Sequence, residues 1–175
     1  MRFADLLRAT VLLSAAAGTT LAVLTVAGAT RVQDDALVLV CTAWWAVAGL
    51  LGGWLGRGAA ASEATATAMA TARAQTTLPE LRPGVALLNR LWPLLALVVA
   101  AGVVALWVPQ VAGVATGFLL LWSLLWRRQE AAVRAVEDRD GATFYVERTS
   151  PFEPVKLVRV PGFRREVPTQ PAEGV

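Results

Sequence analysis

The sequence predicts an all-α membrane protein, a four-helix transmembrane bundle made of two helical hairpins, with a small cytoplasmic β-hairpin in the C-terminal tail. Residues 91–126 contain no Asp, Glu, Lys, Arg or His. Hydrophobic residues make up 56% of the chain, whereas soluble domains usually contain about 45–50% apolar residues. All but one of the 16 basic residues lie in segments that fall on one side of the predicted membrane, as the positive-inside rule requires of cytoplasmic segments.

The second hairpin consists of two apolar runs, residues 91–108 and 111–126, joined by a short turn at Pro109. At about 1.5 Å per residue, each run can cross most of a hydrocarbon layer that is roughly 30 Å thick. The alternative is a buried helix pair of a soluble protein. Such a pair would keep a polar face toward water, but only Gln110, Thr116 and Ser123 are conventionally polar here.

The first hairpin consists of residues 9–29 and 36–56, with a link of six residues between them. The first run also has features of a secretory signal, because it follows a positive start and ends in Ala27-Gly28-Ala29, a signal-peptidase pattern. Its apolar run of about 20 residues exceeds the usual ~7–15 of the apolar h-region of a signal peptide. We favour a retained first helix, and a cleaved signal remains the alternative.

The bundle, residues 1–126, includes a cytoplasmic connection over residues 57–90. Ala60, Ala64, Ala68 and Ala72 recur at helical spacing, so residues 58–77 are expected to form a helix, with a flexible linker as the alternative. Two prolines, Pro79 and Pro83, should then break the helix and leave residues 78–90 at the membrane interface.

The tail, residues 127–175, is expected to be cytoplasmic. Residues 127–140 should continue the fourth helix as far as the Asp140-Gly141 stop signal. Residues 143–160 alternate apolar with polar side chains and predict a β-hairpin, whose apolar face should be covered by the helix of residues 58–77 or by a partner adding to its edge. A tail without fixed structure is the alternative, and residues 161–175 are expected to be disordered.

The charge distribution places both termini in the cytoplasm, and the plasma (inner) membrane is the expected location. Four arginines next to the spans form a basic collar: Arg57, Arg90, Arg127 and Arg128. Such residues fix orientation, and they also attract anionic lipid headgroups. The two interpretations are both open from sequence.

Small residues within the spans indicate close helix packing, because they let two backbones approach each other. The candidates at helical spacing are Gly18, Gly49, Gly53, Gly113 and Gly117. Trp44 and Trp45 lie near the middle of the second span, away from the interfaces that Trp prefers. They should pack against another helix, with lipid or an apolar ligand as the alternative.

The composition argues against an enzyme. The chain has no histidine and a single cysteine, Cys41, so the usual metal sites and Ser-His-Asp catalysis lack their side chains. No ionisable residue lies in the four spans, which disfavours a proton-coupled pump.

We therefore expect a non-catalytic scaffold or accessory protein that needs no cofactor and binds no nucleic acid. Its partners should be membrane lipids and either a second protein or further copies of itself. Partner contact is expected at Phe144, Val146 and Leu157 in the tail. The alternative is a small oligomeric transporter or channel subunit.

Overall fold

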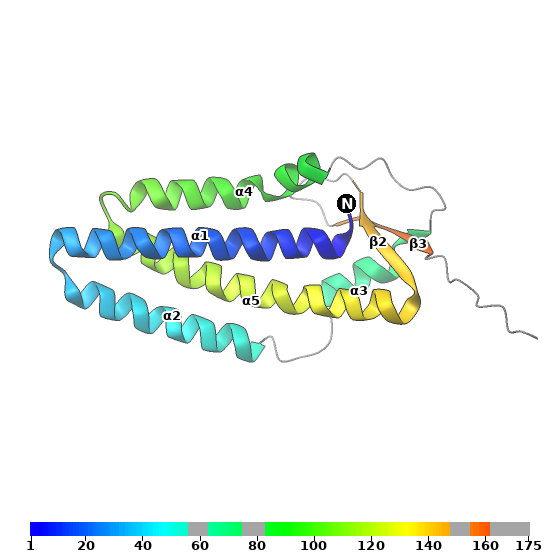
Figure 1. Ribbon diagram of the computed structural model, residues 1–175, viewed down its shortest axis with the longest axis horizontal. Coiled ribbons are helices and arrows are strands. Elements are labelled where there is room, and N and C mark those ends of the chain that lie inside the picture. The colour runs from blue at the N-terminus through cyan, green and yellow to red at the C-terminus, as the bar shows by residue number, and fades with distance from the viewer. Residues whose placement is uncertain (56–62, 75–82, 148–154, 162–175) are drawn as a thin grey trace, which may run out of the picture.

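The computed structural model describes residues 1–55, 63–74, 83–147 and 155–161. It is mostly helical, with a small sheet at one end (Figure 1). The elements in chain order are α1 (Phe3–Val32), α2 (Asp35–Leu55), α3 (Glu63–Ala70), β1 (Arg73–Ala74), α4 (Pro83–Val104), α5 (Pro109–Asp140), β2 (Ala142–Val146) and β3 (Leu157–Pro161). Some parts of the sequence predictions lie outside the described residues, among them Arg57 of the basic collar, residues 78–82 of the segment expected at the interface, residues 148–154 of the expected hairpin, and residues 162–175.

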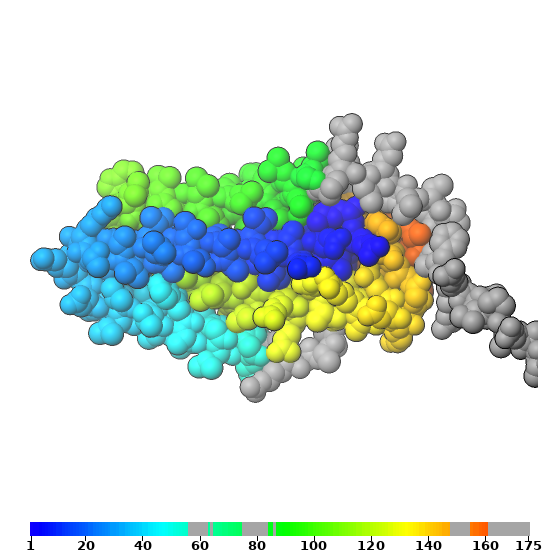
Figure 2. Space-filling view, in the orientation of Figure 1, coloured from blue at the N-terminus to red at the C-terminus, as the bar shows by residue number. Residues whose placement is uncertain are grey.

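Four helices are long and apolar enough to cross a membrane, namely α1, α2, the 87–104 part of α4, and α5. This part of the sequence prediction is confirmed. In Figure 1, α1 lies between α4 and α2, and the four helices run side by side. Figure 2 shows α1 forming a continuous ridge along this face, from the first loop to the strands.

Helix α5 is the main partner of both α1 and α2. It runs antiparallel to α1, because Gly28 lies next to Pro109 while Gly18 lies next to Leu119. It runs parallel to α2, because Gly113 lies next to Cys41 while Gly52 lies next to Leu124. The bundle is thus assembled on α5.

The turn between α1 and α2 is shorter than the six-residue link that the sequence predicts. Gln33 adopts a left-handed conformation (φ 52°) and ends α1. The carboxylate of Asp34 then accepts a hydrogen bond from the Leu37 N–H (3.0 Å) and caps the start of α2. A left-handed C-cap followed at once by an N-cap lets the chain reverse within two residues.

The second hairpin also differs in its turns. The turn occupies residues 105–108, and Pro109 is the first residue of α5 rather than part of the turn. Proline suits this position because the first N–H groups of a helix have no partner within it. For the same reason Pro83 begins α4, so that the expected interfacial segment is helical from residue 83 onward and Pro93 lies inside the helix.

The sheet has three strands in the order β1-β3-β2, not two as predicted. Strands β2 and β3 pair antiparallel from Ala142↔Pro161 to Val146↔Leu157. The third strand comes from the connection, where Arg73 and Ala74 pair parallel with Val158 and Arg159. We call the described parts of residues 1–8, 63–74, 127–147 and 155–161 the end module.

Candidate functional site

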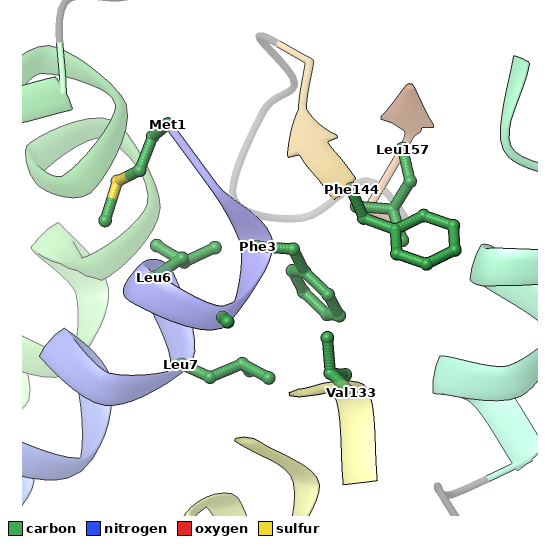
Figure 3. Packing of buried hydrophobic residues seen from close by; sticks show 8 residues of the cluster. Met1, Phe3, Leu6, Leu7, Val133, Phe144 and Leu157 are labelled. Carbon is green, nitrogen blue, oxygen red and sulfur yellow. The ribbon is translucent and has the colours of Figure 1, made fainter. Parts of the chain in front are cut away.

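The end module is held together by one apolar cluster that includes the start of α1. Figure 3 shows Phe3 and Leu7 of α1 facing Val133 of α5, with Phe144 and Leu157 of the sheet beside them. Ala68 and Met69 of α3 pack against the same cluster. The inner face of the hairpin is therefore covered by α1, α5 and α3. Of these, the sequence analysis expected only the helix of residues 58–77.

The N-terminal residues are part of this module. The Met1 carbonyl accepts a hydrogen bond from the Val146 N–H (3.0 Å), and Arg2 forms an isolated antiparallel bridge with Tyr145. Burial lowers the pKa of the Met1 α-amino group below its ordinary value, although the negative charge of Asp5 opposes this shift. The first two residues thus lie along the free side of β2.

The outer edge of β2 is closed to further strands by two contacts. The Glu147 N–H donates to the Lys156 carbonyl (3.0 Å). The backbone N–H groups of the odd-numbered residues of β2 therefore bond to β3, and those of the even-numbered residues point away from β3, toward the outer edge. The outward Val146 N–H is bonded to Met1. The outward Phe144 N–H donates to the Glu137 carboxylate (3.0 Å).

The opposite side of the sheet is also protected along most of its length. β1 covers the outer edge of β3 at Val158 and Arg159. Beyond it, Pro161 has no N–H to offer to a further strand. A partner that adds a strand to β2 or β3 would first have to displace part of this chain.

Part of the outer face of the β2–β3 hairpin is accessible, whereas Val158 on the same face is buried, with an exposed fraction of 3%. Residues that pair directly across two strands lie on one face, and the pairs Thr143↔Val160 and Tyr145↔Val158 lie opposite to Phe144. Thr143, Tyr145 and Val160 are half-buried, while Glu147 and Lys156 are exposed. This face offers an aromatic hydroxyl and two opposite charges within a small area.

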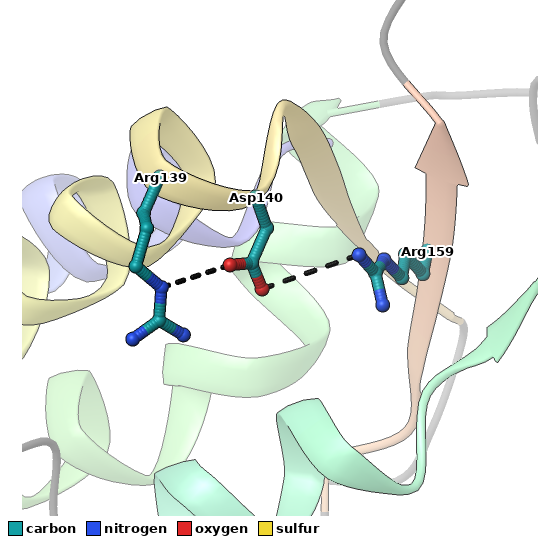
Figure 4. Close-up of polar contacts among 3 residues, drawn as sticks. All are labelled: Arg139, Asp140 and Arg159. Atoms are coloured by element: carbon teal, nitrogen blue, oxygen red, sulfur yellow. Dashed lines mark hydrogen bonds and ion pairs between the residues drawn. The ribbon is translucent and has the colours of Figure 1, made fainter.

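Asp140 connects the end of α5 to β3. Its carboxylate accepts a hydrogen bond from Arg139 Nε (2.9 Å) and lies 4.0 Å from the Arg159 guanidinium (Figure 4). All three residues are exposed, so these ion pairs guide orientation more than they stabilise the fold. The turn itself depends on Gly141, which has a positive φ of 59°.

The residues expected to contact a partner lie mainly inside the chain. Phe144 and Leu157 are buried in the cluster, with exposed fractions of 2% and 4%, and Val146 packs against it. A partner that touched Phe144 or Leu157 would have to open the module. The outer face of the hairpin, which the sequence analysis did not single out, is the part that a partner can reach.

The packing glycines fall into two groups. A Cβ atom added to Gly18 would lie 3.5 Å from the Leu119 Cβ, and one added to Gly113 or Gly117 would collide with Cys41 or Trp44. Around Gly49 and Gly53, in contrast, no described atom lies within 4 Å of such a Cβ. Among the described residues, Gly49 and Gly53 therefore make no close helix contact, and their packing role stays a prediction.

The close approach of α2 to α5 uses Gly52 instead. A Cβ on Gly52 would lie 2.9 Å from Leu124 Cδ1 and 3.4 Å from Leu121 Cα. Gly28 makes a similar approach to Pro109. Gly52 and Gly56 have the same four-residue spacing as Gly49 and Gly53, so the spacing alone does not select Gly52.

Trp44 and Trp45 both hydrogen-bond to the backbone of α5. Trp45 Nε1 donates to the Gly113 carbonyl (2.8 Å), and Trp44 Nε1 donates to the Val114 carbonyl (3.2 Å). The Trp44 ring also meets Phe118 edge-on, with centroids 5.4 Å apart. These contacts give both residues a packing role between helices.

Hydroxyl groups line the interface between α1 and α5, and most are satisfied by their own helix. Thr10, Thr25 and Thr116 donate to carbonyls four residues earlier, and Ser123 donates to one three residues earlier. Ser14 is fully buried, and its hydroxyl has no hydrogen-bond partner among the described residues.

The basic collar is described at three of its four expected positions. Arg127 and Arg128 are exposed on α5, and Arg90 is half-buried on α4. Among the described residues, no group of three or more His, Cys, Asp or Glu side chains is placed to hold a metal ion.

Four apolar helices of spanning length with a small sheet at one end are the features of a multi-pass helical membrane protein. No protein-family model, curated protein or solved structure matches the chain. The functional argument therefore depends on the geometry described above.

Proposed function

We propose that this protein is a non-catalytic membrane scaffold or accessory subunit, which presents the end module to a protein partner on the cytoplasmic side of the plasma (inner) membrane. The observation that carries the proposal is the shared cluster of Phe3, Leu7, Val133, Phe144 and Leu157. Because it joins two spanning helices to the sheet, the module has a fixed position relative to the membrane. A surface held in this way is suited to binding a partner at a fixed distance from the membrane.

The partner surface in this proposal is the outer face of the hairpin, with Tyr145 at its centre. The edges of β2 and β3 are largely occupied by the chain itself, so binding through side chains is favoured over strand addition. Tyrosine is enriched in protein interfaces because its ring supplies area and its hydroxyl supplies a hydrogen bond.

The non-catalytic part of the proposal follows from the sequence. Without histidine, and with its one cysteine buried between helices, the chain lacks an imidazole base and an accessible thiol nucleophile. In the end module, the carboxylates of Glu130 and Asp140 form ion pairs with arginines.

An oligomeric transporter or channel subunit is the second candidate. It is favoured by the open face of α2, where nothing among the described residues lies close to Gly49 or Gly53. The close packing between α1 and α5 at Gly18 argues against a path through a single chain. Oligomeric state in detergent separates the two candidates, since the transporter requires a closed oligomer of this chain alone.

The scaffold proposal is tested by crosslinking and affinity purification from native membranes with full-length variants. Thr143→Glu combined with Tyr145→Ala changes the outer face without touching the core, and we expect it to lose partners that the unmodified chain recovers. The control is Ala131→Glu combined with Ala135→Glu, two exposed positions on α5, which should keep them. Identical partners for all three proteins would refute the proposal. Deleting residues 143–175 is a poorer test because it would also uncover Phe3 and Leu7.

The orientation is tested by labelling single cysteines in a Cys41→Ser background. A membrane-impermeant thiol reagent applied from outside should modify Gln33→Cys and Gln110→Cys, which lie at the two turns away from the sheet. It should spare Glu147→Cys and Arg134→Cys in the end module. The reverse pattern would place both termini outside.

A further inference from the structure

Arginines on α1 and α5 lie at one level of the bundle. Because Gly28 of α1 is opposite Pro109 and Gly18 is opposite Leu119, each step back along α1 corresponds to a step forward along α5. Arg8 therefore falls at the level of Arg127 and Arg128. The packing of Leu7 with Val133 in one cluster agrees with this alignment.

These three side chains carry charge that the described residues do not neutralise. Arg8, Arg127 and Arg128 are exposed, and none of them takes part in an ion pair with a described residue. The carboxylates nearest along these helices are Asp5, which acts on the Met1 amino group, and Glu130, which is bonded to Arg134 (2.8 Å).

On three helices, tryptophans lie on the side of these arginines that faces away from the sheet. Trp122 and Trp126 follow Leu119 on α5, with ring centroids 5.8 Å apart. Trp54 of α2 lies two residues beyond Gly52, which contacts Leu124. Trp92 of α4 lies two residues beyond Arg90, and Trp54, Trp92 and Trp122 are all exposed.

This order of charge and aromatic rings matches the layers of a membrane surface. Indole rings prefer the membrane–water interface at the level of the headgroups, and guanidinium groups bind phosphate through several hydrogen bonds. A side chain placed just outside a belt of tryptophans therefore meets the lipid phosphates.

We propose that Arg8, Arg127 and Arg128 form a binding site for the phosphate groups of anionic phospholipids. The ligand is the lipid rather than free phosphate, because the tryptophan belt places apolar chains directly beneath the arginines. The site selects lipids with net negative charge, since zwitterionic headgroups bring their own cation. It does not depend on the protein partner proposed above.

The test uses the full chain, purified and stripped of lipid, in detergent containing equal amounts of phosphatidylglycerol and phosphatidylcholine. Native mass spectrometry then counts the molecules of each lipid that remain bound. We expect the unmodified protein to retain phosphatidylglycerol preferentially. Arg8→Gln/Arg127→Gln/Arg128→Gln should lose this preference, with each single substitution lowering it about fivefold.

Two matched variants separate charge position from charge number. Arg73→Gln/Arg134→Gln/Arg139→Gln removes the same charge elsewhere in the end module and should keep the preference. Arg8→Lys/Arg127→Lys/Arg128→Lys keeps the positive charge at these three positions and should keep most of the preference for phosphatidylglycerol. If the triple Gln variant fails to fold, the three single variants supply the same comparison.

The proposal is overturned if the triple Gln variant retains phosphatidylglycerol as well as the unmodified protein does, or if the unmodified protein binds both lipids equally. It is also overturned as a lipid site if inorganic phosphate alone displaces the bound phosphatidylglycerol. Recovery of the protein partner is unaffected by any of these outcomes, so the scaffold proposal stands or fails separately.

Discussion

The Val146 N–H donates a hydrogen bond to the Met1 carbonyl oxygen (3.0 Å), and this bond joins the first residue of the chain to a strand near its other end. The bond lies beside Phe3, which has an exposed fraction of 3%. The start of α1 therefore packs against the sheet through both its main chain and a buried side chain.

We predict that Phe3→Ala loosens the sheet without unfolding the bundle. Removing a buried phenyl ring typically costs about 3–5 kcal/mol, and here the loss falls on the end module. Hydrogen exchange followed by mass spectrometry should show faster exchange in peptides from residues 142–147 and 157–161. Leu12→Ala, at an exposed position of α1, is the control. Unchanged exchange in Phe3→Ala would mean that the strands do not depend on α1.

We predict that the first helix is retained in the mature protein. The Ala27-Gly28-Ala29 pattern lies inside α1, with Gly28 against Pro109 and Ala29 buried. Cleavage there would remove the helix that packs along α5. Intact mass of the protein purified from membranes should include residues 1–29, whereas an N-terminus at Thr30 would contradict the prediction.

We predict that Gly52→Leu lowers the melting temperature in detergent far more than Gly53→Leu. At Gly52 the new side chain meets Leu124 and the backbone of α5, while at Gly53 it finds open space. Overpacking of this kind usually costs about 1–3 kcal/mol. Equal melting temperatures for the two variants would show that α2 does not approach α5 as described.

We predict a small but measurable loss of stability for Trp45→Phe. The change removes the hydrogen bond from Nε1 to the Gly113 carbonyl (2.8 Å), and hydrogen bonds between membrane helices contribute about 0.6 kcal/mol on average. Trp54→Phe, at an exposed position, should change the melting temperature less. A larger drop in melting temperature for Trp54→Phe would contradict the prediction that the Trp45 hydrogen bond stabilises the contact between α2 and α5.

The long helices could be predicted because an apolar run of spanning length has few alternatives in lipid. The strands β2 and β3 could also be predicted, because the alternation of apolar and polar side chains is a local pattern in the sequence. The addition of Arg73 and Ala74 as a third strand was not, because parallel pairing with β3 depends on where the connection returns. Nor could the bond from Val146 to Met1 be inferred, since no local pattern encodes it.

The site was harder to predict than the fold, and α2 shows why. Gly52 and Gly53 are adjacent, yet neighbouring residues on a helix point about 100° apart, so one packs and the other faces outward. Which face turns inward is decided by the fit of Trp44 and Trp45 to α5. Similarly, Phe144 was correctly seen as apolar, but only the placement of α1 shows what covers it.

Helix α5 is unbroken over 32 residues, which at 1.5 Å per residue makes it a rod about 48 Å long. One end abuts Gly28 near the Gln33 turn, and the other passes through Gly141 into β2. A tilt of about 5° around its middle would move each end by about 2 Å, close to the size of the helix shifts that switch interfaces between states. α5 is therefore one continuous element that links the sheet to the contact between Pro109 and Gly28 at the other end of the bundle, and a change of tilt imposed at one end would be transmitted to the other.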